Sequence, residues 1–571
     1  MKKLFLYAIM MAAITVSCNE MGLDPIQGGE ELQPVPGVKM ITETLTGGRD
    51  VETKVTINNT SGAFAWTKYD NLAVHVSKGD SHKYVFTKGD GGASIAAAMA
   101  AFTVSYEEGY ARDAFAVFPS TIVAENASNY GQSSTALDVT LPASYTLAQL
   151  TGETTPCPMI ATNDPASSSW NFMQLCGLLR LTVNSIPPST KRLEIDFDGK
   201  KVCGSFSIAS PVTPGTSVIA TTADDSHDII TITKDGTDVT LNGSAWLDGL
   251  VLNIPLPTGD YTNITVTAYD ALTGGNAVIT KSSAFAFTSN RQNATKRTAS
   301  FPIFSVSSTK RVIFAPGNLQ ATTTNGGTSW TWKFAENQYD RIGAAAANNQ
   351  VNGNGTISAT SGTVDLFGRS TSSTYYGISN STSADDYNGV FVDWGNMDID
   401  GKGTNYWFTL AEKEWQYLLG EGIDAQSNYR HNGGTVSGVG NALCTKAKVN
   451  GMRGFIIFPD KYAGGTPNGV TWDVECISPG DMAKSGTDGW GATITLEGWS
   501  TLAKEGCVFL PAGGRRSGNS VFSCSNSDSD YALYLSSDSG KILRVENDGF
   551  DPNQSFSSYY GFSVRLAHVI N

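Results

Sequence analysis

The stretch Tyr406-Trp-Phe-Thr-Leu-Ala-Glu-Lys-Glu-Trp-Gln-Tyr-Leu-Leu419 decides the fold of the C-terminal part of the chain. Thr409 and Glu412 have the spacing of a capping box, in which a hydroxyl and a carboxylate bind the exposed amides of a helix start. Apolar residues then recur at helical spacing on one face, namely Ala411, Trp415, Leu418 and Leu419. Because the surrounding block is rich in Gly and Ser, this face predicts a helix that covers a sheet.

Ordered motifs on both sides of the predicted helix define a C-terminal domain, residues 311–571. They are Phe314-Ala-Pro-Gly-Asn-Leu-Gln320, Val364-Asp-Leu-Phe-Gly368, Gly454-Phe-Ile-Ile-Phe-Pro-Asp460, Val508-Phe-Leu-Pro-Ala-Gly-Gly-Arg515 and Tyr560-Gly-Phe-Ser-Val-Arg-Leu566. In this order they resemble a domain of Bacteroidetes and Fibrobacter surface proteins. That domain is similar to the formylglycine-generating-enzyme family, a variant of the C-type-lectin fold. The resemblance implies an α+β C-type-lectin-like domain. We expect Arg565 to be buried against a carboxylate.

Composition narrows the class of protein. The chain has 571 residues, enough for about three or four domains. Only 16% of its residues are charged and 40% are hydrophobic, with 60 Gly, which favours β-rich extracellular modules. The net charge of -14 and the pI near 4.9 argue against nucleic acid as a partner, because nucleic-acid binding needs a basic surface.

The N-terminus has the pattern of an export signal. Lys2 and Lys3 precede an apolar run over 4–16, which is too short to span a bilayer permanently. The run ends at Ser17-Cys18, and this ending resembles a lipoprotein signal peptide over residues 1–18, with Cys18 as the lipidated residue. Ordinary secretion with an incidental cysteine is the alternative. Either reading places the protein outside the cytoplasm, and lipidation of Cys18 would anchor it in the outer membrane.

Residues 19–50 are rich in Gly, Glu and Pro with little periodicity, and they predict a leader or linker. This segment ends in Thr46-Gly-Gly-Arg-Asp50 just before the first strand pattern. An arginine in such a place suits proteolysis. We therefore take Arg49–Asp50 as the candidate cleavage site.

Two β-rich blocks follow, residues 51–187 and 188–303, and a short linker, 304–310, precedes the C-terminal domain. Period-2 alternation predicts strands at Ala114-Phe-Ala-Val-Phe-Pro119, Leu178-Leu-Arg-Leu-Thr-Val183 and Val251-Leu-Asn-Ile-Pro-Leu-Pro257, among others. These phrases, with Leu256-Pro-Thr-Gly-Asp-Tyr-Thr-Asn-Ile-Thr-Val-Thr267, resemble fimbrillins, the type V pilins of Bacteroidetes. The resemblance implies a mainly β chain with two tandem β-sandwich (transthyretin-like pilin) domains. It also implies export as a lipoprotein, cleavage after an arginine and donor-strand exchange with other pilin subunits.

Catalysis is the less favoured reading of the C-terminal domain. In the formylglycine-generating family, oxidation depends on a closely spaced copper-binding cysteine pair, whereas Cys507 and Cys524 are 17 residues apart here. The histidines of this domain, His431 and His568, have no adjacent nucleophile and carboxylate. We expect no enzyme activity and no resident cofactor, with an oxidase-like enzyme as the weakest alternative.

Ligand binding fits the long Gly-, Ser-, Asn- and Tyr-rich loops of the C-terminal domain, which have the composition of evolved binding loops. Candidate residues for stacking on a sugar ring are Tyr375, Tyr376, Tyr387 and Trp394, although such side chains also simply pack loops. Weak calcium candidates are Asp528, Asp530, Glu546 and Asp548, although acidic loop residues are usually only solvated.

These features together predict a fimbrial (type V pilus) subunit, a tip adhesin that presents its C-terminal domain to a glycan or protein ligand. The alternative is a surface lipoprotein that binds glycan, stays anchored at Cys18 and never polymerises. The two differ in whether the segment before Asp50 is removed.

Overall fold

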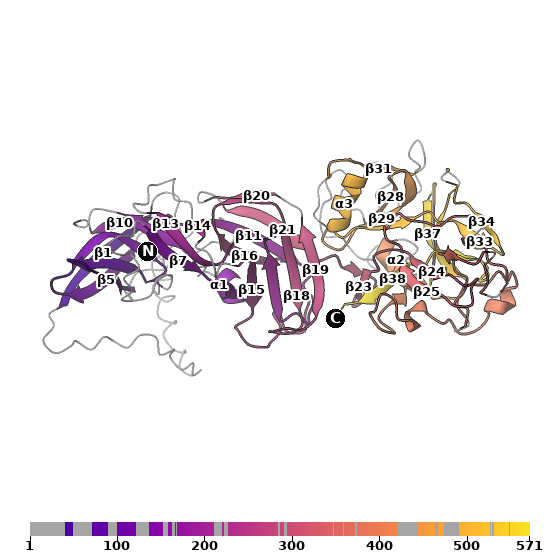
Figure 1. The fold of residues 1–571 in the computed structure, drawn as a ribbon, viewed down its shortest axis with the longest axis horizontal. Helices are drawn as coiled ribbons and strands as arrows, with labels where there is room; N and C mark the ends of the chain where they lie inside the picture. The colour runs from indigo at the N-terminus through magenta and orange to yellow at the C-terminus, as the bar shows by residue number, and fades with distance from the viewer. Residues whose placement is uncertain are drawn as a thin grey trace, which may run out of the picture.

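In the computed structural model the described residues are 40–49, 71–89, 100–120, 136–151, 158–162, 166, 168–209, 220–221, 227–283, 286–290, 294–345, 348–353, 355–357, 359–371, 374–420, 443–462, 466–472, 490–525, 527, 530–547 and 549–570. They form three units in a row, the N-terminal, middle and C-terminal units (Figure 1). Strands dominate all three, so the prediction of a mainly β chain is confirmed. None of the helices in these ranges combines the length and the apolar character that crossing a membrane requires.

The N-terminal unit is an eight-stranded sheet in the order β3-β2-β6-β9-β10-β1-β5-β4. Its strands are β1 (Met40–Arg49), β2 (Ala73–Lys78), β3 (Ser81–Phe86), β4 (Lys88–Gly89), β5 (Ala100–Glu107), β6 (Ala111–Phe118), β9 (Met159–Thr162) and β10 (Ser169–Gln174). Alternate residues of these strands, such as Val74, Val76, Phe102 and Val104, are buried in one apolar cluster. Alternation thus gives the sheet its core face.

The middle unit has a three-stranded sheet, β16-β11-β21, and a five-stranded sheet, β19-β18-β12-β15-β8, whose apolar residues share one core. Its elements are β8 (Ser144–Thr146), α1 (Leu147–Thr151), β11 (Gly177–Asn184), β12 (Arg192–Asp196), β15 (Ile229–Thr233), β16 (Leu250–Leu256), β18 (Ile264–Tyr269), β19 (Ala277–Ser283) and β21 (Thr295–Ser300). Smaller sheets comprise β17 (Gly259–Tyr261) with β20 (Phe287–Ser289), and β7 (Ala136–Leu141) with β13 (Gly204–Ala209) and β14 (Ala220–Thr221).

The boundary predicted at 187/188 is wrong. β8 and β11 both precede it, yet they belong to sheets of the middle unit. β11 lies between β16 and β21 and contributes Leu179 and Leu181 to the core of that unit. The chain therefore enters the middle unit, returns to the N-terminal unit for β9 and β10, and enters the middle unit again. Local strand patterns carry no information about this long-range pairing.

In its described residues, the C-terminal unit contains several small sheets and two α-helices. Its strands are β22 (Phe304–Ser305), β23 (Arg311–Phe314), β24 (Leu319–Thr323), β25 (Thr331–Phe334), β26 (Gly362–Val364), β27 (Phe408–Thr409), β28 (Cys444–Val449), β29 (Met452–Ile457), β30 (Val470–Thr471), β31 (Ala492–Ile494), β32 (Val508–Pro511), β33 (Arg515–Ser517), β34 (Ser520–Phe522), β35 (Ala532–Leu535), β36 (Lys541–Glu546), β37 (Gly549–Ser555) and β38 (Leu566–Val569). Its helices are α2 (Glu412–Leu419) and α3 (Leu496–Lys504), with short 3-10 turns at Ala384–Tyr387 and Trp394–Asn396. Strand β23, near the start of this unit, pairs with β38, the last strand of the unit.

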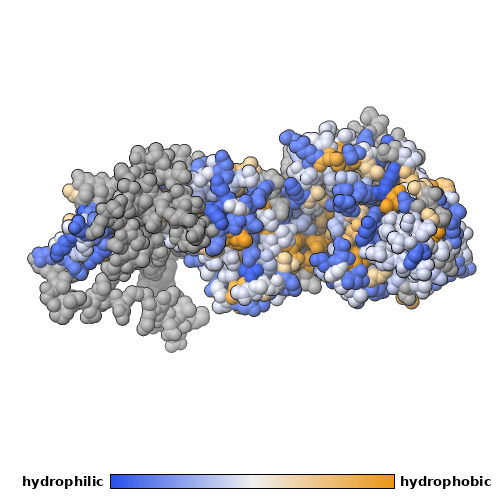
Figure 2. Space-filling view, viewed as in Figure 1, coloured by the Kyte–Doolittle hydropathy of each residue, from blue (hydrophilic) through white to orange (hydrophobic). Residues whose placement is uncertain are grey.

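The predicted short linker, residues 304–310, is packed rather than free, because Phe304 and Val306 are buried in the core of the C-terminal unit. The middle unit makes further contacts with this unit. The Lys281 ammonium, which is buried, lies 2.8 Å from a Glu505 carboxylate oxygen and donates to the Lys504 carbonyl at 2.6 Å. Figure 2 shows apolar residues at the surface where the two units meet. The two units are therefore joined by buried contacts.

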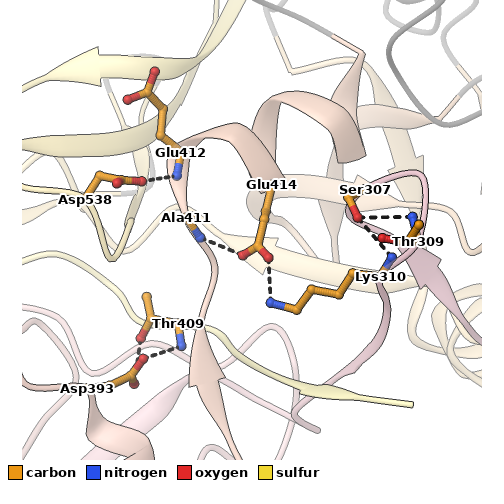
Figure 3. A network of polar contacts seen from close by, with 9 residues as sticks. All are labelled: Ser307, Thr309, Lys310, Asp393, Thr409, Ala411, Glu412, Glu414 and Asp538. Atoms are coloured by element: carbon orange, nitrogen blue, oxygen red, sulfur yellow. Dashed lines mark hydrogen bonds and ion pairs between the residues drawn. The ribbon is translucent and has the colours of Figure 1, made fainter. Parts of the chain in front are cut away.

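Helix α2 lies where the sequence predicted a helix, and it buries Trp415, Leu418 and Leu419 in the core of the C-terminal unit. The predicted capping box is wrong: the Thr409 amide and hydroxyl both donate to Asp393 instead (Figure 3). The helix begins after Ala411, whose amide donates to the Glu414 carboxylate at 2.9 Å. The helix start lies two residues after the predicted one, because Thr409 still belongs to strand β27.

Two further features of this unit differ from the expectations. Helix α3 was not predicted, although Thr495 caps it and Trp499 and Leu502 are its buried face. Arg565 is buried as expected, but it donates to the carbonyl oxygens of Ala315 and Phe509 rather than to a carboxylate. The carbonyls of two neighbouring segments take the place of the expected acid.

Replacing Glu414 by alanine should destabilise the C-terminal unit. The Glu414 carboxylate accepts from the Ala411 amide and from Lys310 at 2.6 Å, so its loss removes a helix cap and a partly buried ion pair (Figure 3). We expect a loss of about 1–3 kcal/mol in unfolding free energy. Calorimetric unfolding of Glu414→Ala measures this loss of unfolding free energy. Lys413→Ala is the control, because it changes an exposed residue of the same helix. Equal losses in the two variants would contradict this role.

Candidate functional site

Strand β1 is the first candidate functional element, because it is an interior strand that ends at the predicted cleavage site. It pairs antiparallel with β5, from Met40↔Glu107 to Gly47↔Ala100. On its other edge it pairs parallel with β10, from Thr46↔Ser169 to Arg49↔Phe172. Arg49 is thus the last paired residue of β1, while Asp50 and Cys18 lie outside the described residues. Residues 40–49 of the predicted leader or linker are therefore a paired strand, and removal of this segment stays a prediction.

Large apolar side chains line the two strands that flank β1. Phe102, Val104 and Tyr106 of β5 and Trp170 and Phe172 of β10 are all at most 3% exposed. They belong to one cluster, against which Ile41 of β1 packs. Without β1, the neighbouring edges of β5 and β10 would lose their backbone partners, and this cluster would lose part of its cover.

The aromatic residues predicted to stack on a sugar divide into two pairs. Tyr375 is 37% exposed, and Tyr376 is half-buried and packs edge-on against Trp332. Both stay candidates for ligand contact.

Tyr387 and Trp394 are not available to a ligand, so their prediction as stacking residues is wrong. They are 3% and 0% exposed. The Trp394 indole donates to the Tyr376 carbonyl at 2.9 Å and packs against Phe367 and Phe391. These rings are the internal packing of the loops that carry them.

Two of the four calcium candidates form ion pairs with arginines, and the other two lie outside the described residues. Asp530 is fully buried, lies 3.1 Å from the Arg341 guanidinium and accepts from the Ser525 amide. Glu546 forms an ion pair with Arg544. Asp528 and Asp548 fall in the undescribed positions. The two described carboxylates are therefore part of ion pairs, and calcium binding there stays an untested prediction.

The described cysteine pair considered for oxidase chemistry consists of two free thiols. Cys507 is 1% exposed, and burial raises its pKa. Burial also raises the pKa of the half-buried Cys524. A raised pKa keeps a thiol protonated at neutral pH, which is the unreactive form. His568 stacks on Tyr406, and its Nδ1 lies 2.8 Å from the Tyr406 carbonyl oxygen.

Arg515 lies in a surface cluster that no pattern in the sequence indicated. Its guanidinium lies 6.0, 5.8 and 5.4 Å from the ring centres of Phe522, Phe556 and Tyr560. Phe522 is 48% exposed, and Tyr560 packs against half-buried Tyr559. An accessible cation among aromatic rings is a suitable surface for stacking and hydrogen bonding to a polar ligand. We call these five residues the Arg515 cluster.

Arg516, the next residue of strand β33, points the other way and is fully buried. It donates to the carbonyl oxygens of Leu366, Gly377, Ser379 and Gly518. Burial lowers the pKa of Arg516 to about 10, so the side chain stays charged at neutral pH. Its hydrogen bonds connect the loop that carries Tyr375 with the hairpin that carries Arg515. Strand alternation is the signal in the sequence that separates the two arginines.

Comparison with known proteins gives distant likenesses only. No protein-family model and no curated protein matches the chain. A solved structure from Bacteroides ovatus, provisionally assigned to cell adhesion, is 14% identical over 45% of this chain and 91% of its own, with a TM-score of 0.28. The tip fimbrial protein Mfa3 from Porphyromonas gingivalis, truncated at its C-terminus, is 12% identical over 44% and 81%, with a TM-score of 0.19. A fimbrial assembly protein from Parabacteroides distasonis is 11% identical over 48% and 94%, with a TM-score of 0.21. Likenesses at these identities and TM-scores do not indicate a function for this chain.

Alanine substitutions at the two neighbouring arginines should lower the unfolding free energy of the protein by very different amounts. Arg516→Ala leaves several buried carbonyl groups without a hydrogen-bond donor, and each such group costs about 1–3 kcal/mol of stability. We therefore expect the unfolding free energy to fall by at least about 3 kcal/mol. Arg515→Ala removes only partly exposed cation–ring contacts and should cost about 1 kcal/mol or less. Denaturant unfolding of both variants measures the difference. Similar losses would contradict the division of roles, and Arg516→Lys serves as the milder variant if Arg516→Ala does not fold.

Proposed function

We propose that this chain is a fimbrial subunit of the adhesin type, which joins neighbouring subunits through the place of β1 and presents its C-terminal unit to a ligand. The observation that carries the proposal is the position of β1 inside the sheet, with its last paired residue at Arg49. Cleavage after Arg49 would separate the whole strand from the chain. Dissociation of the cut strand would then leave a vacant strand position between β5 and β10.

A vacant position inside a sheet is filled most favourably by another β-strand. Backbone amides and carbonyls along β5 and β10 would need partners, and Phe102, Tyr106, Trp170 and Phe172 would need cover. A strand from a neighbouring subunit supplies both, which is the β-augmentation mode of recognition. Donor-strand exchange between pilin subunits follows from this. The export signal at 1–18 would bring the chain to the outer membrane as a lipoprotein, lipidated at Cys18, before processing.

The C-terminal unit is the part we assign to adhesion. It lies at one end of the row of units, beyond the middle unit (Figure 1). A unit of this size suits the end of a fimbrium rather than its stalk, so we place the chain at the tip. The resemblance to C-type-lectin-like domains supports binding of a glycan or protein ligand without catalysis, and the high pKa of the Cys507 thiol agrees with a non-catalytic role. Tyr375 and the Arg515 cluster are the ligand contacts we favour.

One observation favours a second function. β1 is paired on both edges, so the N-terminal sheet is complete without any partner. If β1 stays in place, the chain is a monomeric surface lipoprotein anchored at Cys18 that captures glycan through the same C-terminal unit.

Replacing Arg49 by lysine separates these two functions. Arg49→Lys keeps the charge and the strand but removes the bond that an arginine-specific protease cuts. We expect treated wild-type protein to begin at Asp50 by mass spectrometry and to form multimers in size-exclusion chromatography. The variant should stay intact at this position and monomeric. Wild-type protein that is cut after Arg49 yet stays monomeric would contradict strand exchange, and excess synthetic peptide of residues 40–49 should suppress multimers if the vacant position drives them.

Ligand contacts can be tested on an array of immobilised glycans with the full chain. If Tyr375 and Arg515 contact the ligand, Tyr375→Ala and Arg515→Ala should each weaken retained binding by roughly tenfold or more, as expected for the removal of a central interface residue. Val390→Ser is the matched control, because Val390 is 84% exposed in the same unit. Binding that is lost equally in the control, or unchanged in both variants, would place the ligand elsewhere.

A further inference from the structure

A polar cluster lies in the N-terminal sheet on β2, β3 and β6, on the far side of β9 and β10 from β1. β3 is the edge strand, β2 follows it and β6 comes next. In the β2–β3 hairpin His75 is opposite Tyr84, and Ser77 is opposite His82. Directly opposed residues and residues two apart along a strand share a face of the sheet. His75, Ser77 and His82 therefore lie on one face, opposite to the apolar face that carries Val74 and Val76.

An irregularity in the pairing of β2 with β6 brings an acid to the same place. Val74 pairs with Ala116 and Val76 pairs with Arg112, so three residues of β6 oppose His75 alone. Asp113 is one of them. Bulged strands re-aim side chains in this way, often beside functional sites. Because of this bulge, the Asp113 carboxylate reaches across to both histidines.

Distances show how closely the three side chains converge. Nδ1 of His75 lies 2.6 Å from Oδ2 of Asp113, and Nδ1 of His82 lies 4.0 Å from the same oxygen. The two imidazole rings are stacked with centres 5.5 Å apart. One ligand atom from each residue lies within 4.8 Å of the others, and elsewhere in the described ranges no three His, Cys, Asp or Glu side chains converge in this way.

These distances are close to those around a bound transition metal. Bonds of about 2.0–2.2 Å from a tetrahedral zinc ion would place ligand atoms about 3.3 Å apart. The two observed separations from Asp113, 2.6 and 4.0 Å, lie on either side of this value. Metal binding would require the His75–Asp113 separation to increase and the His82–Asp113 separation to decrease.

The hydrogen bonding of the cluster leaves one histidine nitrogen available. The Nδ1 atom of His82 is buried and, among the described residues, has no hydrogen-bond partner. The Ser77 hydroxyl donates to Oδ1 of Asp113 at 2.7 Å, which fixes the carboxylate and leaves Oδ2 toward the histidines. Outer contacts of this kind orient metal ligands. The side chains of His82 and Asp113 are 25% and 28% exposed, which gives an ion a path to the site, whereas His75 is 1% exposed.

We propose that His75, His82 and Asp113 bind one divalent transition-metal ion of the zinc type. Two imidazoles and one carboxylate are the ligand set of zinc sites that keep a fourth position for water or another ligand. Calcium and magnesium prefer a shell of oxygen ligands, which the two imidazoles do not provide. The ion would join the edge hairpin β2–β3 to β6. Binding to the folded state alone would stabilise the N-terminal unit by mass action.

Calorimetric titration of the EDTA-treated, dialysed full chain with zinc chloride at pH 7.5 tests the proposal. We expect one equivalent to bind, and calcium or magnesium chloride at the same concentration to give no binding. His82→Gln and Asp113→Asn should each remove this binding. Ser77→Ala, which loses only an outer contact, should weaken it by roughly 10- to 100-fold. His227→Gln is the matched control, because it removes an exposed histidine of another unit and should bind as wild type does.

Zinc that fails to bind the wild-type chain, or that binds His82→Gln and Asp113→Asn as tightly as wild type, would overturn the proposal. Equal binding of calcium would overturn the assignment to a transition metal. Circular dichroism establishes that each variant is folded. If Asp113→Asn does not fold, His82→Gln decides the question, because His82 lies on the edge strand and its side chain is partly exposed.

Discussion

Backbone pairing on both edges of β1 is the constraint on which the N-terminal unit depends. Buried amide and carbonyl groups need partners, and β1 supplies them to β5 on one side and β10 on the other. In the strand order of this sheet, no other strand connects those two. The strand that completes the sheet is also the first described segment of the chain. Once the chain is cut after Arg49, only non-covalent contacts hold this strand in the sheet, so a strand from another molecule could take its place.

Strand positions could largely be predicted from alternation, whereas strand partners could not. The predicted strands around Leu178–Val183 and Val251–Pro257 correspond to β11 and β16. The missed strand β1 contains Thr42, Thr44, Thr46 and two glycines, so it lacks the apolar alternation that marks a buried strand. It exists because β5 and β10 pair with it. The wrong boundary at 187/188 has the same origin, since β11 follows β10 closely in sequence but pairs with β16 and β21.

The candidate site residues show the same division between local and long-range information. Loop composition indicated aromatic residues in binding loops, but it could not separate exposed Tyr375 from buried Tyr387 and Trp394. Alternation along a short strand distinguishes Arg515 from Arg516 once the strand is known. The meeting of His75 with Asp113, 38 residues later, depends on a bulge in the β2–β6 pairing. No local pattern in the sequence encodes such a bulge.

If the C-terminal unit binds a ligand as proposed, its junction with the middle unit would transmit the load. A ligand that pulls on the C-terminal unit pulls on the chain that leaves β21, and β21 runs parallel to its partner β11 over six residue pairs. A strand pulled along its own axis loads those hydrogen bonds together rather than one after another. Lys281, bound to Glu505 and the Lys504 carbonyl, and buried Phe304 restrict rotation at the same junction. Force on the ligand would therefore reach the middle unit through paired strands and buried contacts, without a free linker between them.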